Sequence, residues 1–518
     1  MTRDHDIDVL VIGAGPAGVC AALRLQQLGY QVAVVERMRL PRANIGESLT
    51  PGVRNILDLL DASDAIATVP VLTNLQTHLL WDTREPALVP QHPSGGSMMI
   101  DRGAFDHALF RLVGTRGGLG IAPGEIGKIE GVPGAWRVPI QHDQQSSRIS
   151  ARLILDARGR SATPNAPRIA LAPPLLALWA KIAGAGAPTE TQVEALANGW
   201  LWGSPLPDGA YRVMTFCDPS TLRQAMRGQP EQWLRACMAQ SRLFAELAQR
   251  RFLAPVQACA STPYVDAQAW AEGQLKLGDA AFAIDPLSSS GVEKAMRFSL
   301  QAAVAVHTLL SDATAAPLAQ EFFQDRLLDC VARHRLWTRR YYQQAWPGAA
   351  HDFWRSRSVE FEVGVSDCSP FAAALRQACS NITTPEKQQP AQTVKTPPLH
   401  SLSRAALLNG SIALSPDLAF VELPCVVDNR VQLRQAISHP NLDRPVAYVA
   451  GQEIASLLHV VAHVASLSTA IELWAHRMPP HTASSIAAWL CQKGVLQLAT
   501  PSYSPRVAPA DLTGIRRS

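Results

Sequence analysis

The fold is decided by the stretch Asp8-Val9-Leu10-Val11-Ile12-Gly13-Ala14-Gly15-Pro16-Ala17-Gly18. Its first part is a short apolar, β-branched run, which is typical of a parallel strand buried on both faces. A G-x-G-x-x-G turn follows, then a helical pattern to residue 28, and then a second strand over 31–35 that ends at Glu36. This order of strand, turn, helix, strand and acid predicts a Rossmann-type βαβ unit that binds a dinucleotide.

Each part of this unit has a physical role at a phosphate site. Gly13 allows the tight turn, Gly15 lets the backbone approach a pyrophosphate, and Gly18 lets the helix pack closely on the strand. The helix N-terminus offers N–H donors and the positive end of its dipole. Glu36 can accept hydrogen bonds from a ribose. A glycine-rich turn without a ligand is the alternative, and the completeness of the unit disfavours it.

The composition of the whole chain indicates its protein class and excludes some kinds of partner. It has 518 residues, 47% hydrophobic and 17% charged, which predicts a globular protein of about three domains. The formal net charge of +4 gives no reason to expect nucleic acid or a membrane as a partner. None of the 9 cysteines forms a C-x-x-C pair, so we expect free thiols, no disulfides and no metal site.

The N-terminus and the longest apolar stretch indicate where the protein resides. Acidic residues precede the first apolar run, which is unlike a secretory signal. The stretch 454–474 is interrupted by His459, His463 and Glu472, and this is more typical of buried helices than of a membrane span. We therefore expect a cytoplasmic protein.

Three further segments decide which dinucleotide is bound. They are Pro41-Arg42-Ala43-Asn44-Ile45-Gly46-Glu47-Ser48-Leu49, Leu153-Ile154-Leu155-Asp156-Ala157-Arg158-Gly159-Arg160-Ser161, and 277–292, which includes Asp285-Pro286-Leu287-Ser288-Ser289-Ser290-Gly291. With the first motif, this set resembles the FAD-dependent aromatic hydroxylases that have one dinucleotide domain. Within them it is most similar to the branch that contains flavin-dependent halogenases and their non-halogenating relatives. The resemblance covers about residues 5–350.

The resemblance implies FAD as the cofactor and assigns roles to residues. Asp279 would hold the ribityl chain or pyrophosphate, Arg102 would lie against the cofactor, and Gly46-Glu47-Ser48 would line the flavin. We also expect Gly291 to adopt a positive φ, and the helix after it to direct its N-terminal dipole at the reduced flavin. The predicted cofactor-binding residues are Gly13, Gly15, Ala17, Gly18, Glu36, Arg37, Arg42, Gly46, Glu47, Ser48, Arg102, Asp279, Pro286, Ser290, Gly291 and Val292.

A tryptophan pair carries the strongest halogenase signal. Halogenases of this branch are marked by W-x-W-x-I-P, and the chain has Trp200-Leu201-Trp202-Gly203-Ser204-Pro205, with Ser204 in place of isoleucine. Alternation along a strand would put both tryptophans on one face, where they could form a substrate pocket. Two ordinary core tryptophans are an equally open reading.

The two groups that make halogenation work are missing. The family's halogenating lysine would fall near residues 74–84, and the chain has no lysine before Lys128. Ser288 stands where tryptophan halogenases carry a glutamate. The resemblance then favours hydroxylation, in which reduced FAD and O2 form a C4a-hydroperoxyflavin that an aromatic ring attacks. A base must remove the ring proton, and the catalytic candidates are Glu47, His78 and Asp82.

The pattern predicts an α/β protein with four segments. Residues 1–165 and 263–380 form an FAD-binding domain with a parallel Rossmann-type sheet and a helical extension over 320–380. An antiparallel-sheet substrate domain is inserted at 166–262, a Pro-rich linker follows at 381–400, and 401–518 form a small helical, winged-helix-like domain. That last domain resembles modules that capture leader peptides, and a lid on the catalytic domain is the alternative.

These observations predict an FAD-dependent monooxygenase that hydroxylates an indole ring. The tail suggests a tryptophan within a peptide or small protein, as in the flavoproteins of tryptophylquinone maturation, with a radical enzyme as a further partner. Because no second G-x-G-x-x-G is present, NAD(P)H would reduce the flavin transiently or a separate flavin reductase would do so. The alternatives are a halogenase with a displaced lysine, for example Lys181, and a non-catalytic FAD-containing assembly protein. The sequence leaves the regiochemistry, electron donor and oligomeric state open.

Overall fold

The structure is a computed structural model that describes residues 3–83, 85–89, 96–164, 167–226, 229–364, 367–382, 411–442, 444–461, 464 and 466–498. The chain divides into two compact units, residues 1–382 with 426–431 and residues 383–425 with 432–518. The predicted FAD-binding and substrate domains thus lie within one compact unit. The predicted linker, 381–400, falls outside the described residues apart from its first two positions.

A mixed sheet around β1 (Arg3–Ile12) forms one end of the first unit and is called the parallel sheet here, because β12, β1, β2, β8 and β21 pair in parallel. It follows the order β10-β11-β12-β1-β2-β8, and β21 pairs with β12. Val9, Leu10 and Val11 are fully buried, as the sequence predicts for a strand covered on both faces. The other strands are β2 (Val32–Val35), β8 (Leu119–Ile121), β9 (Glu125–Ile126), β10 (Glu130–Val132), β11 (Ala135–His142), β12 (Gln145–Asp156), β20 (Trp270–Ala271) and β21 (Gln274–Lys276).

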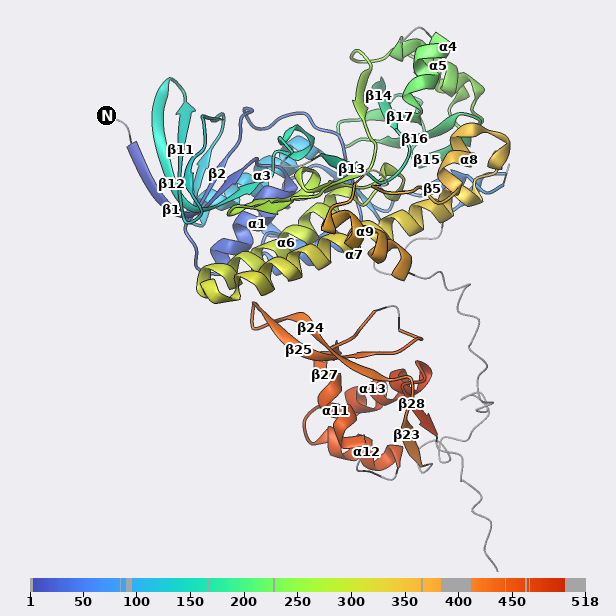
Figure 1. Ribbon diagram of the computed structural model, residues 1–518. Coiled ribbons are helices and arrows are strands. Elements are labelled where there is room, and N and C mark those ends of the chain that lie inside the picture. Colours follow the sequence, from blue (N-terminus) through green and yellow to red (C-terminus); the bar gives the residue numbers. More distant parts are fainter. Residues whose placement is uncertain are drawn as a thin grey trace, which may run out of the picture. The chain divides into compact units, whose positions relative to one another are not determined.

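Helices pack on this sheet and on one another. The helix α1 (Pro16–Gln27) starts directly after the glycine turn and packs against α6 (Gly291–Ser311), which in turn packs against α7 (Ala316–Gln344). In Figure 1, α6 and α7 run side by side along the first unit. The remaining helices of this unit are α2 (Gly52–Leu59), α3 (Arg102–Thr115), α4 (Pro219–Met226), α5 (Pro230–Gln240), α8 (Asp352–Ser358) and α9 (Pro370–Asn381).

A second sheet lies at the other end of the first unit (Figure 1) and is called the substrate sheet here. Among the described residues its order is β18-β14-β17-β16-β15-β5-β6. Its strands are β18 (Gln257–Ala260), β14 (Leu176–Ala183), β17 (Ala210–Cys217), β16 (Gly199–Pro205), β15 (Thr191–Leu196), β5 (Thr77–Leu80) and β6 (Ala87–Leu88).

The substrate sheet recruits strands from outside the predicted insert 166–262. The strand β5 pairs in parallel with β15, and β6 pairs with β5. Local pattern could not reveal this, because β5 has only four residues and its partner lies far along the chain. Two small sheets, β13-β19-β22 and β3-β7-β4, connect the layers. They comprise β13 (Arg168–Ala170), β19 (Tyr264–Asp266), β22 (Phe282–Ala283), β3 (Ser48–Leu49), β7 (Met98–Ile100) and β4 (Val71–Leu72).

The second unit is small and combines three helices with short strands in the part that the structure describes. Its apolar core contains the fully buried Leu458, Ala470 and Leu490 together with Trp474. Three helices followed by a short strand appear in the order that the sequence predicts. The elements after residue 411 are β23 (Ile412–Leu414), β24 (Ala419–Val427), β25 (Arg430–Ser438), β26 (Tyr448–Val449), β27 (Gln452–Glu453), α11 (Ile454–Val461), α12 (Leu467–Ala475), α13 (Pro480–Gln492) and β28 (Leu496–Leu498), which pairs with β23. Residues 426–431, which include the ends of β24 and β25, are grouped with the first unit.

Two features are absent from the part of the chain that the structure describes. None of the helices there has both the length and the apolar character that a bilayer crossing requires. No group of three or more histidine, cysteine or acidic side chains in those same ranges could hold a metal ion.

Candidate functional site

A large cavity lies where the parallel sheet meets the substrate sheet. Its volume is about 780 Å³, and its wall combines residues of β1, β2 and α1 with residues of β14, β16 and β17. The predicted cofactor residues on this wall are Gly13, Gly15, Ala17, Glu36, Arg37, Arg42, Gly46, Glu47, Ser48, Arg102, Asp279, Pro286, Gly291 and Val292. The predicted substrate residues Trp200 and Trp202 lie on the same wall. One cavity therefore joins the nucleotide motif to the tryptophan pair.

The glycine turn forms what we call the nucleotide end of the cavity, residues 12–17, 35–42 and 157–161. Gly13 has φ +108°, and a Cβ there would lie 2.5 Å from the carbonyl oxygen of Ala157, so only glycine fits. Gly15 caps α1, and no atom lies within 4 Å of the place a Cβ would take. The N-terminus of α1 is therefore open to the cavity, as the pyrophosphate of a dinucleotide requires. These residues fit FAD.

Gly18 does not line the cavity. A Cβ at this position would meet the carbonyl oxygen of Gly13 and lie 3.1 Å from Val11 Cγ1. Gly18 thus lets α1 pack closely on β1 and supports the turn from behind.

Glu36 closes β2 and fixes the shape of the nucleotide end. Its Oε2 accepts a hydrogen bond from the Ala14 N–H at 3.0 Å, and its Oε1 accepts one from the Met38 N–H at 2.9 Å. The Arg42 guanidinium lies 3.4 Å from Oε2. Since each carboxylate oxygen has two lone pairs, the side chain can still accept from a ribose hydroxyl.

The Arg102 guanidinium is bonded to other groups of the protein at the cavity wall, so it is not free to bind a phosphate. It begins α3, is buried, and pairs with Asp106 at 3.2 Å. Its Nη1 also donates to the carbonyl oxygens of Ile45 at 3.0 Å and Gly46 at 2.9 Å. Burial raises the pKa of Asp106, and the neighbouring Arg102 charge opposes that rise. This pair fixes the segment that leads into Glu47.

Glu47 forms an ion pair with a residue of the substrate sheet. Its Oε1 accepts from Arg212 Nη2 at 2.5 Å and from Arg212 Nε at 3.1 Å. Both side chains are buried, and Arg212 belongs to β17. Glu47 is therefore engaged in a buried ion pair while it lines the cavity.

Asp279 lies on the cavity wall between two cations. Its carboxylate is 3.3 Å from Arg160 Nε and 3.2 Å from Lys294 Nζ. Arg158 and Arg160 also line the cavity, beside Arg37 and Arg42. This concentration of guanidinium groups suits an anionic cofactor.

The turn 286–292 forms part of what we call the ring end, together with Trp200, Trp202, Met214, Phe216 and Asp285. The expected positive φ at Gly291 is wrong, because Gly291 is already the first residue of α6. Ser289 takes the left-handed conformation instead, with φ 48°. Ser290 does not line the cavity, and its hydroxyl lies 2.9 Å from that of Ser288. The N-terminus of α6 still reaches the wall, through Gly291 and Val292.

Aromatic and sulfur-containing side chains cover the substrate-sheet side of the ring end. Trp200 stacks on Phe216, with ring centroids 3.8 Å apart and an interplanar angle of 14°. In the β16–β17 register Trp200 faces Phe216 and Trp202 faces Met214, and all four line the cavity. This face can hold a flat apolar ring.

The three predicted bases are placed differently. Glu47 is on the cavity wall, but His78 and Asp82 are absent from the wall residues that the structure describes. Asp82 is exposed to solvent and His78 is on the edge region of the substrate sheet, in β5. The geometry gives neither of these two residues a route to a bound ring, so it does not support them as bases.

Sequence reasoning missed Asp285 as a site residue. Asp285 is 4% exposed, accepts a hydrogen bond from the Leu287 N–H at 3.0 Å, and receives the Tyr342 hydroxyl at 3.2 and 3.3 Å. Burial raises its pKa to about 6 and raises that of Tyr342 well above its usual range. Asp285 directly precedes Pro286 and Leu287 of the predicted flavin turn, so its position in this motif could have identified it as a site residue. Met214, Phe216, Arg158 and Arg160 were also missed.

Comparisons with known proteins agree with this site. The family model for tryptophan halogenase matches residues 8–83 and 97–367, more than half of the chain. Tryptophan 2-halogenase of Chondromyces crocatus is 28% identical over 338 residues, which are 61% of this chain and 64% of that protein. The flavin-dependent halogenase armH3 of Armillaria mellea is 23% identical over 425 residues, which are 74% of this chain and 83% of that protein.

Two solved structures share the fold along nearly the whole chain. The peptidyl tryptophan dihydroxylase QhpG, described as essential for tryptophylquinone cofactor biogenesis, has a TM-score of 0.69 and 24% identity, and the match covers 95% of this chain and all of that one. The flavin-dependent halogenase CmlS has a TM-score of 0.70 and 18% identity, with 96% of both chains covered. From the match of the family model, the chain belongs to the tryptophan halogenase family of flavin-dependent oxidoreductases, and its cofactor is FAD.

Proposed function

We propose that this protein is an FAD-dependent monooxygenase that hydroxylates the indole ring of tryptophan within a peptide or small protein. The single observation that carries the proposal is the lining of the cavity. A nucleotide end that fits FAD continues into an aromatic ring end, and no lysine is found among the described residues of the wall.

Three lysines of the first unit are held in ion pairs. Lys181, the candidate for a displaced halogenating lysine, pairs with Asp208 at 2.7 Å and is not on the wall. Lys276 pairs with Asp266 at 2.6 Å. Lys294 is held by Asp279 and by the carbonyl oxygen of Phe282 at 2.8 Å. A halogenase that needs a lysine amine on its cavity wall would find none among the wall residues that the structure describes.

The chain's own residues suit ring hydroxylation. Reduced FAD, when bound, would activate O2 and supply an electrophilic oxygen. Trp200, Trp202 and Phe216 would hold an indole by stacking and edge contacts, which fixes the orientation of its reacting carbon. The apolar wall would keep water from the activated oxygen.

A peptide substrate is supported by the extent of the fold likeness to QhpG. The match covers 95% of this chain, so it reaches into the second unit as well as the catalytic one. The printed description of that protein names a peptidyl tryptophan as what it hydroxylates. We carry the same substrate class to this chain as part of the proposal, together with reduction by NAD(P)H or by a separate flavin reductase.

Halogenation is the second candidate, and the sequence relatives favour it. The first relatives are named as halogenases, among them Tryptophan 2-halogenase at 28% identity. The absence of a wall lysine among the described residues is the reason to rank this candidate second.

One assay separates the two candidates. The holoprotein, a flavin reductase and NADH would be mixed with tryptophan-containing peptides under ¹⁸O2, with bromide present. We expect product that gains ¹⁸O and no bromine. Brominated product without ¹⁸O would refute the proposal in favour of halogenation.

A further inference from the structure

Asp285 separates the large cavity from a second, smaller one. The second cavity has a volume of about 80 Å³ and lies beside α7 and α8. Asp285 and its neighbour Ile284 line both cavities. Among the described residues Asp285 is therefore the one titratable group that can meet a bound substrate on one side and a separate space on the other.

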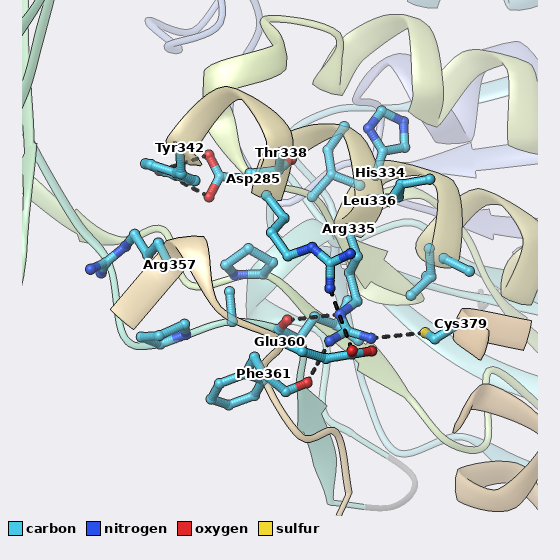
Figure 2. A pocket seen from close by; sticks show the side chains of 18 of the residues that line it. Asp285, His334, Arg335, Leu336, Thr338, Tyr342, Arg357, Glu360, Phe361 and Cys379 are labelled. Atoms are coloured by element: carbon cyan, nitrogen blue, oxygen red, sulfur yellow. Dashed lines mark hydrogen bonds and ion pairs between the residues drawn. The ribbon is translucent and has the colours of Figure 1, made fainter. Parts of the chain in front are cut away.

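The second cavity leads from Asp285 toward the surface. Figure 2 shows the Tyr342 hydroxyl directed at the Asp285 carboxylate, with Arg335, Glu360 and Cys379 further along the wall. The wall also includes Val359, which is 56% exposed, so part of this wall reaches the protein surface. A site needs roughly 10–15 Å³ to hold one water molecule, so this cavity has room for several.

Polar groups follow the same path. Arg335 donates to the carbonyl oxygen of Phe361 at 2.5 Å, and Arg339 lies 3.6 Å from Glu360. Thr338, which is on the same helix as Arg335 and Arg339, also lines this cavity. Water in such a space can find the two or more polar partners it needs, so it can carry a proton outward.

We infer that Asp285 is the base that takes the proton from the substrate ring, and that this proton leaves through the second cavity. The inference rests on the proposed function. In the hydroxylation, one atom of O2 forms a bond to a ring carbon and the other leaves as water, with reduced FAD supplying two electrons. The ring carbon then loses its hydrogen as a proton to Asp285, and the C–H electron pair restores the aromatic ring.

The charges around Asp285 suit this role. The only cation among the groups that shift its pKa is Arg357 of α8, which is itself paired with Asp218 at 2.7 Å. The Tyr342 hydroxyl of α7 and the Leu287 N–H also favour the ionised form, while burial opposes it. With a pKa of about 6, the group is ionised at neutral pH yet binds a proton more tightly than an exposed carboxylate does.

The test compares Asp285→Asn with a matched control. Asparagine keeps the shape and can still accept from the Leu287 N–H, so the holoprotein should fold and bind flavin. Glu194→Gln removes another buried carboxylate, which accepts from the Arg242 and Leu243 N–H groups and is not among the wall residues of either cavity. We expect Asp285→Asn to lose product formation by roughly 100-fold while NADH consumption and H2O2 release continue. Glu194→Gln should form product and consume NADH at the wild-type rate.

Two further readouts do not depend on turnover rate alone. A substrate deuterated at the target carbon should give an isotope effect in Asp285→Asn that is absent from the wild type. The infrared band of a protonated carboxyl group should titrate near pH 6 in the wild-type holoprotein and be missing in Asp285→Asn. In Tyr342→Phe the titration should move to higher pH, because the lost hydrogen bond stabilised the ionised form.

The outcomes separate this inference from the proposed function. Ring-proton loss accompanies both hydroxylation and halogenation, so whichever product the wild type forms can be followed. Wild-type product without ¹⁸O refutes the proposed function but leaves Asp285 to be judged by the variants. Product formation in Asp285→Asn within threefold of the wild type, or no carboxyl band near pH 6, overturns the role of Asp285.

Discussion

The two ends of the large cavity are built in opposite ways. At the nucleotide end, most of the wall consists of backbone and charged groups of the first βαβ unit, residues 12–17 and 35–42, joined by 157–161 from the end of β12, and glycines hold its shape. At the ring end, the wall consists of side chains from strands and helices that are distant in sequence, such as Trp200, Phe216 and Asp285. The first end is thus specified locally and the second by long-range packing. A mutation at one end should therefore change either flavin binding or ring chemistry, but not both. A mutation in the contact that joins the two ends should change both.

That contact is the Glu47–Arg212 pair, where we expect the largest effect. Arg212→Met would leave the buried Glu47 carboxylate without its cation, and such a loss costs about 3–5 kcal/mol. The midpoint of chemical denaturation should fall, and flavin should be lost in parallel. The double variant Glu47→Gln/Arg212→Met should recover much of the stability. A single variant as stable as the wild type would show that the two ends are independent.

The nucleotide end should respond to backbone strain. Gly13→Ala would force a side chain into a positive φ and against the carbonyl oxygen of Ala157, which costs at least about 2 kcal/mol. We expect a lower melting temperature and colourless protein. Retention of bound flavin with an unchanged melting temperature would contradict the role given to this turn.

At the ring end, removing a buried charge should change the stability of the protein in a pH-dependent way. Because the folded state raises the pKa of Asp285 from 3.8 to about 6, stability linked to this group is present below pH 3.8 and is lost as the pH rises through 6. Asp285→Asn should therefore stabilise the protein at pH 8 by about 1–3 kcal/mol, and by less at pH 4. Thermal unfolding at both pH values measures this difference. Equal changes at the two pH values would contradict it.

The smallest effect on stability is expected at Gly15. Its φ of −74° suits alanine, and a Cβ there meets nothing, so Gly15→Ala should change stability by less than about 0.5 kcal/mol. The added methyl group would stand in the space reserved for the pyrophosphate. Flavin titration should show weaker binding with an unchanged melting temperature. Unchanged affinity would place the pyrophosphate elsewhere.

The sequence predicted the nucleotide end well because its geometry is local. The first strand, the glycine turn, α1 and β2 follow one another without a gap, and their periodicities differ. The long helices α6 and α7 and the order of elements in the second unit were also foreseen, since each carries its own apolar repeat. The prediction of the left-handed residue was wrong by two positions, because Ser289 rather than Gly291 takes that conformation.

The ring end could not be predicted in the same way. His78 and Asp82 were chosen by distance along the chain from the Gly-Glu-Ser segment, and that distance says nothing about where a strand will pair. The parallel pairing of β5 with β15 carries His78 into the substrate sheet. Asp285 lies within a recognisable motif, but its burial and its hydrogen bond to Tyr342 depend on α7, and Tyr342 is 57 residues further along the chain.

The incorporation of β5 into the substrate sheet has a consequence for redesign. An engineer who wished to convert this protein into a halogenase would first consider His78→Lys, in the segment 74–84 where the family resemblance predicts a halogenating lysine. In this fold that amine would emerge away from the cavity, since no residue of β5 is among the described wall residues. Switching the chemistry would therefore require rebuilding a stretch of main chain, and point mutagenesis at that spacing should yield no halogen transfer.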